Sequence, residues 1–151
     1  MKNKASNFAF IKVKHNSSEY WHIVELRDKV LRKPLGLEFA KDELMAENEQ
    51  FHFGLYKNKV LVGCLVLVKC SSFELKMRQV AIDPSFQSQG VGTLMINESE
   101  AWALHNGYSR MVLNARETAL AFYKKKSYQI IGNSFLEVGI PHFKLFKNLT
   151  S

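Results

Sequence analysis

Residues 77–92, MRQVAIDPSFQSQGVG, join a strand-like run to a pair of glycines that open an amphipathic stretch. The strand-like run stops at Asp83-Pro84, because proline has no N–H to give to a ladder and restricts the residue before it. The stretch therefore predicts a strand, a short turn containing Gly90 and Gly92, and a helix of about four turns. Apolar residues recur along this helix at three- and four-residue spacing, at Val91, Leu94, Met95, Ala101 and Trp102.

A helix that begins at such a loop is suited to hold an anion. Its first N–H groups have no partner within the helix, and the aligned peptide dipoles leave about half a positive charge there. Glycine at positions 90 and 92 lets phosphate oxygens approach the main chain without a Cβ in the way. The loop lacks the residues of a P-loop and of a dinucleotide fingerprint. Taken alone, the two glycines are explained equally well by a tight turn with close helix packing.

Further strands and helices surround this stretch. Ser17 or Ser18 can cap a helix that Pro34 and Gly36 interrupt, and residues 41–50 fit either a short helix or a loop. Residues 118–126 predict a second amphipathic helix, and residues 139–142 a turn. Strands are predicted over residues 8–13, 51–56, 60–68, 73–82, 108–113, 128–131 and 142–146. From residue 51 onward the order is β-β-β-α-β-α-β-β, which indicates an α/β fold of the mixed α+β kind, in three layers.

Composition sets the class of protein. The 151 residues, 46% of them hydrophobic, predict a single domain over residues 1–151. No apolar run is long enough to span a membrane and no signal peptide is recognisable, so we expect a cytoplasmic protein. The net charge of +7 favours polyanions, whether nucleic acid, an anionic membrane or a phosphorylated cofactor. Cys64 and Cys70 lie in a strand-like run and are interpreted as reduced core residues.

Two motifs in order give a resemblance to a known family. QSQGVG, residues 87–92, and ALAFYKKKSY, residues 119–128, resemble the two landmarks of the GNAT superfamily of N-acetyltransferases, with Ser127 where that family has glycine. VLRKPLGL, residues 30–37, and FLEVGIPHFKLFK, residues 135–147, look like a subgroup of small bacterial members, which names no substrate. The resemblance implies the GNAT acyl-CoA N-acyltransferase fold, a central mixed sheet of six to seven strands with helices on both faces.

The resemblance also implies a cofactor, acetyl-CoA (coenzyme A). Its pantetheine arm is expected to lie like an added strand along β-strand residues, and its pyrophosphate on the loop amides. The family often has Asn seven residues before its tyrosine, where this chain has Arg116, and Asn114 is the alternative contact. Lys124, Lys125 and Lys126 fit either phosphate contacts, for which Lys125 is our choice, or a solvated helix end. The expected cofactor-binding residues are Val80, Ala81, Ile82, Gln87, Ser88, Gln89, Gly90, Val91, Gly92, Thr93, Asn114, Arg116 and Lys125.

Acyl transfer to an amine needs a neutral amine, a polarised carbonyl and a proton for the departing thiolate. Main-chain N–H groups near residues 80–82 are candidates for polarising the carbonyl. The resemblance places the leaving-group acid at Tyr123, which as a residue also fits a half-buried aromatic of the helix. Glu74, Glu137 and His142 are weak candidates for the base, and each also has an ordinary structural explanation. We expect no metal ion to take part.

The expected activity is transfer of the acetyl group of acetyl-CoA to a primary amine of a small molecule or peptide. The alternative is a non-catalytic acyl-CoA-binding regulatory domain. Loss of turnover in a Tyr123→Phe variant would distinguish the enzyme from this alternative. A basic nucleic-acid-binding module ranks last, because no recognition motif accompanies the charge. We therefore expect neither a nucleic acid nor a membrane as partner, and a monomer or homodimer.

Overall fold

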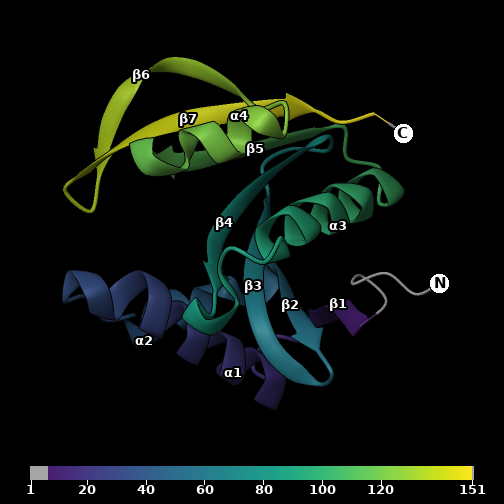
Figure 1. The fold of residues 1–151 in the computed structure, drawn as a ribbon, viewed down its shortest axis with the longest axis vertical. Helices are drawn as coiled ribbons and strands as arrows, with labels where there is room; N and C mark the ends of the chain where they lie inside the picture. The colour runs from purple at the N-terminus through teal and green to yellow at the C-terminus, as the bar shows by residue number, and fades with distance from the viewer. Residues whose placement is uncertain (1–6, 151) are drawn as a thin grey trace. The chain divides into compact units, whose positions relative to one another are not determined.

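The computed structural model describes residues 7–150, which fall into two compact units (Figure 1). Within the described residues, the first comprises residues 7–67 and Gln79–Ser99, and the second Val68–Arg78 and residues 100–150. The strands are β1 Phe8–Val13, β2 Phe51–Lys57, β3 Val60–Lys69, β4 Glu74–Ile82, β5 Arg110–Arg116, β6 Gln129–Glu137 and β7 Ile140–Asn148. The α-helices are α1 Ser18–Arg27, α2 Lys41–Met45, α3 Val91–His105 and α4 Leu120–Lys125. No helix within the described residues is both long and apolar enough to cross a bilayer.

The seven strands follow the order β1-β2-β3-β4-β5-β7-β6 in one mixed sheet. Strands β1 with β2, β2 with β3, β5 with β7, and β6 with β7 pair antiparallel. The exception is β4, whose residues Glu74 to Met77 pair in parallel with Arg110 to Leu113 of β5. Parallel neighbours need a crossover connection, and helix α3 lies in the chain between these two strands. The predicted mixed sheet is confirmed, with seven strands.

In the first unit, helices lie on both faces of the strands, as two neighbouring residues of β3 show. Successive side chains of a strand point to opposite faces. Cys64 packs in a buried cluster with Ile23 and Leu26 of helix α1. At Gly63, an added Cβ would come 2.6 Å from the sulfur of Met95 in helix α3, so this glycine lets the helix approach the other face.

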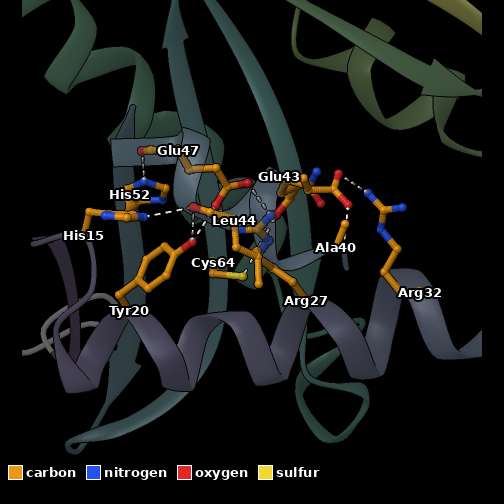
Figure 2. A network of polar contacts seen from close by, with 11 residues as sticks. His15, Tyr20, Arg27, Arg32, Ala40, Glu43, Leu44, Glu47, His52 and Cys64 are labelled. Carbon is orange, nitrogen blue, oxygen red and sulfur yellow. Dashed lines mark hydrogen bonds and ion pairs between the residues drawn. The ribbon is translucent and has the colours of Figure 1, made fainter. Parts of the chain in front are cut away.

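Figure 2 shows a buried polar network that joins α1 to the segment before β2. The guanidinium of Arg27, fully buried, donates from Nη1 and Nη2 to the two carboxylate oxygens of Glu47, at 2.8 and 2.7 Å. The Tyr20 hydroxyl donates to the same carboxylate at 2.8 Å. The His52 Nε2 lies 2.9 Å from the main-chain oxygen of Glu47. A buried ion pair is tolerated when both charges are paired and hydrogen-bonded in this way.

Contacts around Phe39 extend the network to the segment between the two helices. The guanidinium groups of Arg27 and Arg32 lie 4.6 and 4.3 Å from the centroid of the Phe39 ring. Glu43 accepts a hydrogen bond from the Ala40 N–H at 3.0 Å at the start of α2, and lies 3.6 Å from the Arg32 guanidinium. The sequence leaves residues 41–50 open between helix and loop. The structure forms α2 there, followed by a 3-10 turn, Ala46–Glu49.

Burial and charge set the protonation of this network. Burial by itself raises the pKa of Glu47, but the hydrogen bonds and the charge of Arg27 outweigh it and hold that pKa below its usual range. Burial lowers the pKa of His52, which keeps its imidazole neutral at pH 7. Its Nε2–H then donates to the carbonyl, and Nδ1 is a buried acceptor without a hydrogen-bond partner among residues 7–150. The network is therefore a fixed ion pair beside a neutral histidine.

In the second unit, β5, β7 and β6 form an antiparallel ribbon, with helix α4 beside it (Figure 1). The ring of Tyr123 on α4 packs edge-on against Tyr128, with centroids 5.6 Å apart. The Tyr128 hydroxyl donates to Glu100 at 2.8 Å, and Lys147 of β7 donates to the other oxygen of that carboxylate at 2.7 Å. These contacts fix the C-terminal end of α4 on one face of the ribbon.

Three expectations from the sequence need correction. Strand β6 runs to Glu137, beyond the predicted end at residue 131, because β7 gives it a long antiparallel partner. The predicted turn over residues 139–142 is displaced toward the N-terminus, since Ile140 and Pro141 already belong to β7. Cys70 is exposed at the end of β3, where the chain leaves the sheet, whereas Cys64 is buried as expected.

Replacement of Arg27 by Met should destabilise the protein by about 3–5 kcal/mol, because the Glu47 carboxylate would stay buried without its cation. The Arg27→Met/Glu47→Leu double variant should regain most of that loss, since the Tyr20 hydroxyl still has the Leu44 carbonyl at 3.3 Å. Urea unfolding followed by circular dichroism measures both. As a control, Lys29→Met removes an exposed cation and should change stability by less than about 0.5 kcal/mol. Equal losses in the single and double Arg27 variants would contradict the ion-pair explanation.

Candidate functional site

Strand β4 changes its backbone conformation in its middle, at Gln79. Gln79 has φ of +56°, a left-handed conformation that non-glycine residues rarely adopt inside a strand. The main-chain oxygen of Gln79 lies 4.0 Å from the Cys64 sulfur. Ala81 is buried in the cluster formed with α1, and the strand alternation therefore turns Val80 and Ile82 away from that cluster. The C-terminal part of β4 thus begins at a change of backbone conformation, and its Ala81 side chain packs against α1.

The loop between β4 and α3 is held by its own side chains. The Asp83 carboxylate caps the following turn by accepting from the Ser85 N–H at 2.9 Å. The side-chain amides of Gln87 and Gln89 donate back to the carbonyls of Ile82 and Ser85, at 3.2 and 3.3 Å. Because these two side chains donate to carbonyl groups, they do not accept from the main-chain N–H groups at the start of α3.

The start of α3 presents main-chain amides. Gly90 has φ of +77°, and an added Cβ would meet nothing within 4 Å, so the glycine faces open space. Ser88, two residues earlier, also has a positive φ of +64°. The Leu94 N–H donates to the Gly90 carbonyl at 3.1 Å, which is the first bond of the helix. The N–H groups of residues 91–93 precede that bond and have no carbonyl within their own helix. The arrangement is therefore able to receive several anionic oxygens at once.

Tyr123 belongs to the second unit, where it is the buried aromatic residue of α4. Its side chain is 8% exposed, and burial raises the pKa of its hydroxyl to about 12. Such a phenol is protonated throughout the physiological range and can donate a proton but not take one. The neighbouring contact with Tyr128 fixes the ring. Burial therefore keeps this hydroxyl in its protonated form.

The three candidate bases do not lie together. Glu74, at the start of β4, lies 3.4 Å from the guanidinium of Arg110 in the ladder with β5. Glu137 and His142 lie together near the turn between β6 and β7, with Nε2 3.5 Å from a carboxylate oxygen. The Asn114 side-chain amide donates to the other oxygen of Glu137 at 3.1 Å. The structure thus joins two candidate bases with an expected cofactor contact and leaves Glu74 apart.

The remaining expected cofactor contacts are surface residues. Arg116 is exposed at the end of β5, and Lys125 is exposed at the end of α4. Two features of the site were missed from the sequence, the bend at Gln79 and the thiol of Cys64 beneath it. A glutamine within a strand-like run carries no signal for a positive φ, so only the structure reveals this bend.

The two cysteines should react differently with thiol reagents. Burial raises the pKa of Cys64 to about 12, so very little thiolate is present at pH 8, whereas Cys70 is exposed. Native protein treated with dithiobisnitrobenzoate at pH 8 should therefore react rapidly at one of its two thiols, and at both in urea. The Cys70→Ser variant should lose the rapid phase. A rapid phase that persists in this variant would show that β4 opens over Cys64 in the native state.

Comparison with known proteins supplies the family. Residues 15–128 match the model of the acetyltransferase (GNAT) family. The Bacillus subtilis (strain 168) protein YjcF, an uncharacterized N-acetyltransferase, is 33% identical over 124 residues, which are 82% of this chain and 88% of YjcF.

Two solved structures show the same fold. An acyl-CoA N-acyltransferase from Pseudomonas aeruginosa has a TM-score of 0.79 at 16% identity, covering 93% of this chain and 99% of that one. A GNAT family acetyltransferase from Elizabethkingia anophelis, with acetyl-CoA bound, has a TM-score of 0.74 at 17% identity, covering 95% and 99%. The family-model match and the identity to YjcF establish that this chain is an acyltransferase and belongs to the acetyltransferase (GNAT) family.

Proposed function

We propose that the protein transfers the acetyl group of acetyl-CoA to a primary amine of a small molecule or peptide. The observation that carries the proposal is the set of uncapped main-chain amides at the start of α3, behind the left-handed turn at Gly90. A pyrophosphate supplies closely spaced anionic oxygens for such amides. Family membership and the acetyl-CoA bound to the Elizabethkingia anophelis protein support this choice of anion.

In this proposal the first unit holds the cofactor. The N–H groups of residues 89–93 bind the pyrophosphate, with Gln87 and Ser88 beside them. The pantetheine arm pairs with the main chain of Val80, Ala81 and Ile82, and an N–H group of this segment polarises the thioester carbonyl. The parallel ladder with β5 runs from Glu74 to Met77 and does not include these three residues, which supports pairing of their main chain with the arm. Phosphate contacts by Arg116 and Lys125, which belong to the second unit, stay a prediction from the family motif.

The reaction is a direct attack. The neutral amine nitrogen forms a bond to the thioester carbonyl carbon, and the carbon–sulfur bond breaks as the tetrahedral intermediate collapses. The sulfur leaves as a thiolate and needs a proton. We propose that Tyr123 gives it, since burial keeps its hydroxyl protonated and the tyrosine stands at the matching position of the family motif. The nitrogen is positively charged after attack and loses one proton to solvent as the amide forms, and solvent returns a proton to the Tyr123 phenolate.

We also propose that the chain acts as a single cytoplasmic domain, as a monomer or homodimer, with neither nucleic acid nor membrane as a partner. The same amides would also serve a non-catalytic acyl-CoA-binding domain. The hydroxyl of Tyr123 separates the two functions, because cofactor binding alone does not require it.

Gly90→Ala should weaken acetyl-CoA binding at least tenfold, or about 1.4 kcal/mol, because the added methyl group stands where phosphate oxygens approach. The matched control is Gly36→Ala. Gly36 has a similar φ of +68° and also faces open space, so alanine introduces the same backbone strain away from the loop. Isothermal titration calorimetry measures binding and urea unfolding measures strain. If wild-type protein bound neither acetyl-CoA nor coenzyme A, or if both variants bound equally, the proposed cofactor site would be wrong.

Tyr123→Phe should lower kcat about 100-fold while leaving the Kd for acetyl-CoA within about twofold, since only the proton donor is lost. Thiol release from acetyl-CoA across polyamines, aminoglycosides, amino acids and peptides supplies the assay and finds the best acceptor. Phe122→Leu, a neighbouring and more exposed position on α4, is the control for packing and should keep its kcat. Full turnover in Tyr123→Phe would show that Tyr123 is not the acid. Cofactor binding without release to any amine would favour the regulatory domain.

A further inference from the structure

The turn between β6 and β7, in the second unit, carries a histidine and a carboxylate that face each other. His142 pairs in register with Phe135, and Glu137 with Ile140. The imidazole is 7% exposed, while the Glu137 side chain is 48% exposed. Nε2 of His142 lies 3.5 Å from a carboxylate oxygen of Glu137, longer than a direct hydrogen bond. The pair is therefore buried on the histidine side and open on the carboxylate side.

The protonation pattern of His142 follows from its other nitrogen. Nδ1 lies 2.7 Å from the Ile140 main-chain oxygen, and a carbonyl can only accept, so Nδ1 carries the hydrogen. In the neutral imidazole, Nε2 then presents a lone pair toward the Glu137 carboxylate. Two acceptors face each other, and a group that donates from two N–H bonds satisfies both. A primary ammonium ion is such a group.

Asn114 fixes the direction of the carboxylate. Its amide donates to one oxygen of Glu137 at 3.1 Å and leaves the other oxygen facing His142. The Phe135 ring lies 6.2 Å from the imidazole, tilted by 31°, and covers one side of it. Strands β5, β6 and β7 each contribute to the cluster, so its geometry is set by the ladder and not by a single loop.

We propose that Glu137 and His142 bind the ammonium group of the acceptor and that His142 removes its proton, an inference that rests on the proposed acetyl transfer. Nε2 takes one proton from R–NH3+ and becomes part of an imidazolium, which the Glu137 carboxylate and the Ile140 carbonyl stabilise. The amine is left neutral, with its lone pair available to attack the thioester. His142 is then a catalytic residue and Asn114 a positioning residue. The imidazolium returns its proton to water after the product leaves.

Neighbouring charges support proton removal over simple capture of a cation. Arg116 stands opposite His142 in the ladder with β5, and Lys144 stands opposite Asn114. Residues directly opposite share a face of the sheet, so both cations lie on the face of the cluster. A nearby positive charge disfavours the charged form of an amine, whereas Glu137 attracts that charged form. The cluster therefore combines a carboxylate that attracts the ammonium with two cations that favour loss of its proton.

The first test measures binding of an ammonium ion by nitrogen NMR of the His142 ring. The ring signals are assigned as those that are missing in the His142→Asn variant. Ethylammonium should shift the Nε2 signal saturably. Tetramethylammonium, which has the charge but no N–H bond, should not. Glu137→Gln should weaken the ethylammonium effect at least tenfold, and Glu98→Gln, an exposed carboxylate on α3, should leave it unchanged. No shift, or an equal shift with both cations, would overturn the proposal whatever the turnover.

The second test is turnover with two acceptors of similar size, ethylamine and trifluoroethylamine, the latter largely neutral at pH 7. His142→Asn keeps a donor for the Ile140 carbonyl and removes the base. It should lower kcat/KM about 100-fold with ethylamine and less than about threefold with trifluoroethylamine. Equal losses with both amines would reduce His142 to a structural role and overturn the proposal. Acetyl-CoA binding by His142→Asn, measured by calorimetry, should equal that of the wild type. Failure of the wild type to bind acetyl-CoA would instead contradict the proposed function.

Discussion

The ion pair between Arg27 and Glu47 is the constraint on which the first unit depends. A guanidinium with none of its side chain in water must be given a carboxylate in a matching orientation, and the pair joins α1 to the segment before β2 at two hydrogen bonds. Tyr20 donates to the same carboxylate, and His52 contacts the main-chain carbonyl of the same glutamate. Figure 2 shows the sulfur of Cys64 beside this pair. The main-chain oxygen of Gln79, at the bend of β4, lies 4.0 Å from that sulfur, so the ion pair and Cys64 form a fixed layer next to the bend.

That fixed layer explains how β4 holds its conformation. A non-glycine residue at positive φ costs about 1–3 kcal/mol and persists only where its surroundings determine it. Gln79 meets that condition, since its carbonyl lies over Cys64 and the next inward side chain, Ala81, is buried against α1. The bend belongs to the strand that leads into the uncapped amides of α3. The packing of α1 therefore stabilises the strained conformation of the segment that we assign to the cofactor.

Features of the chain that are local in sequence were predictable, and those that need distant partners were not. The turn at Gly90 and the start of α3 follow from glycine spacing and apolar periodicity, and both are confirmed. The role of Glu47 could not be predicted, because it is one of several acidic residues in a polar segment. Nothing in the neighbouring sequence indicates that Arg27, 20 residues away, is buried against it. Strand β6 was predicted too short for the same reason. Its second half lacks strand alternation and is extended because β7 pairs with it.

The candidate site shows the same division. The Tyr123 motif could be recognised from contiguous residues, but the sequence could not choose among three bases, since the choice depends on the register of β5, β6 and β7. Once register is known, a further relation follows. Lys147 lies on the face of β7 that carries the contacts of α4, and His142, five residues earlier, lies on the other face.

This separation by the ribbon matters for the two proton transfers. Tyr123, packed on Tyr128, belongs to the face of Lys147, and the cluster of Asn114, Glu137 and His142 belongs to the opposite face. In the proposed reaction Tyr123 gives a proton to the leaving thiolate, and His142 takes one from the incoming ammonium, at two different atoms of the reactants. The alternation of side chains along β7 therefore keeps the proposed acid and the proposed base apart, so that neither forms a hydrogen bond with the other.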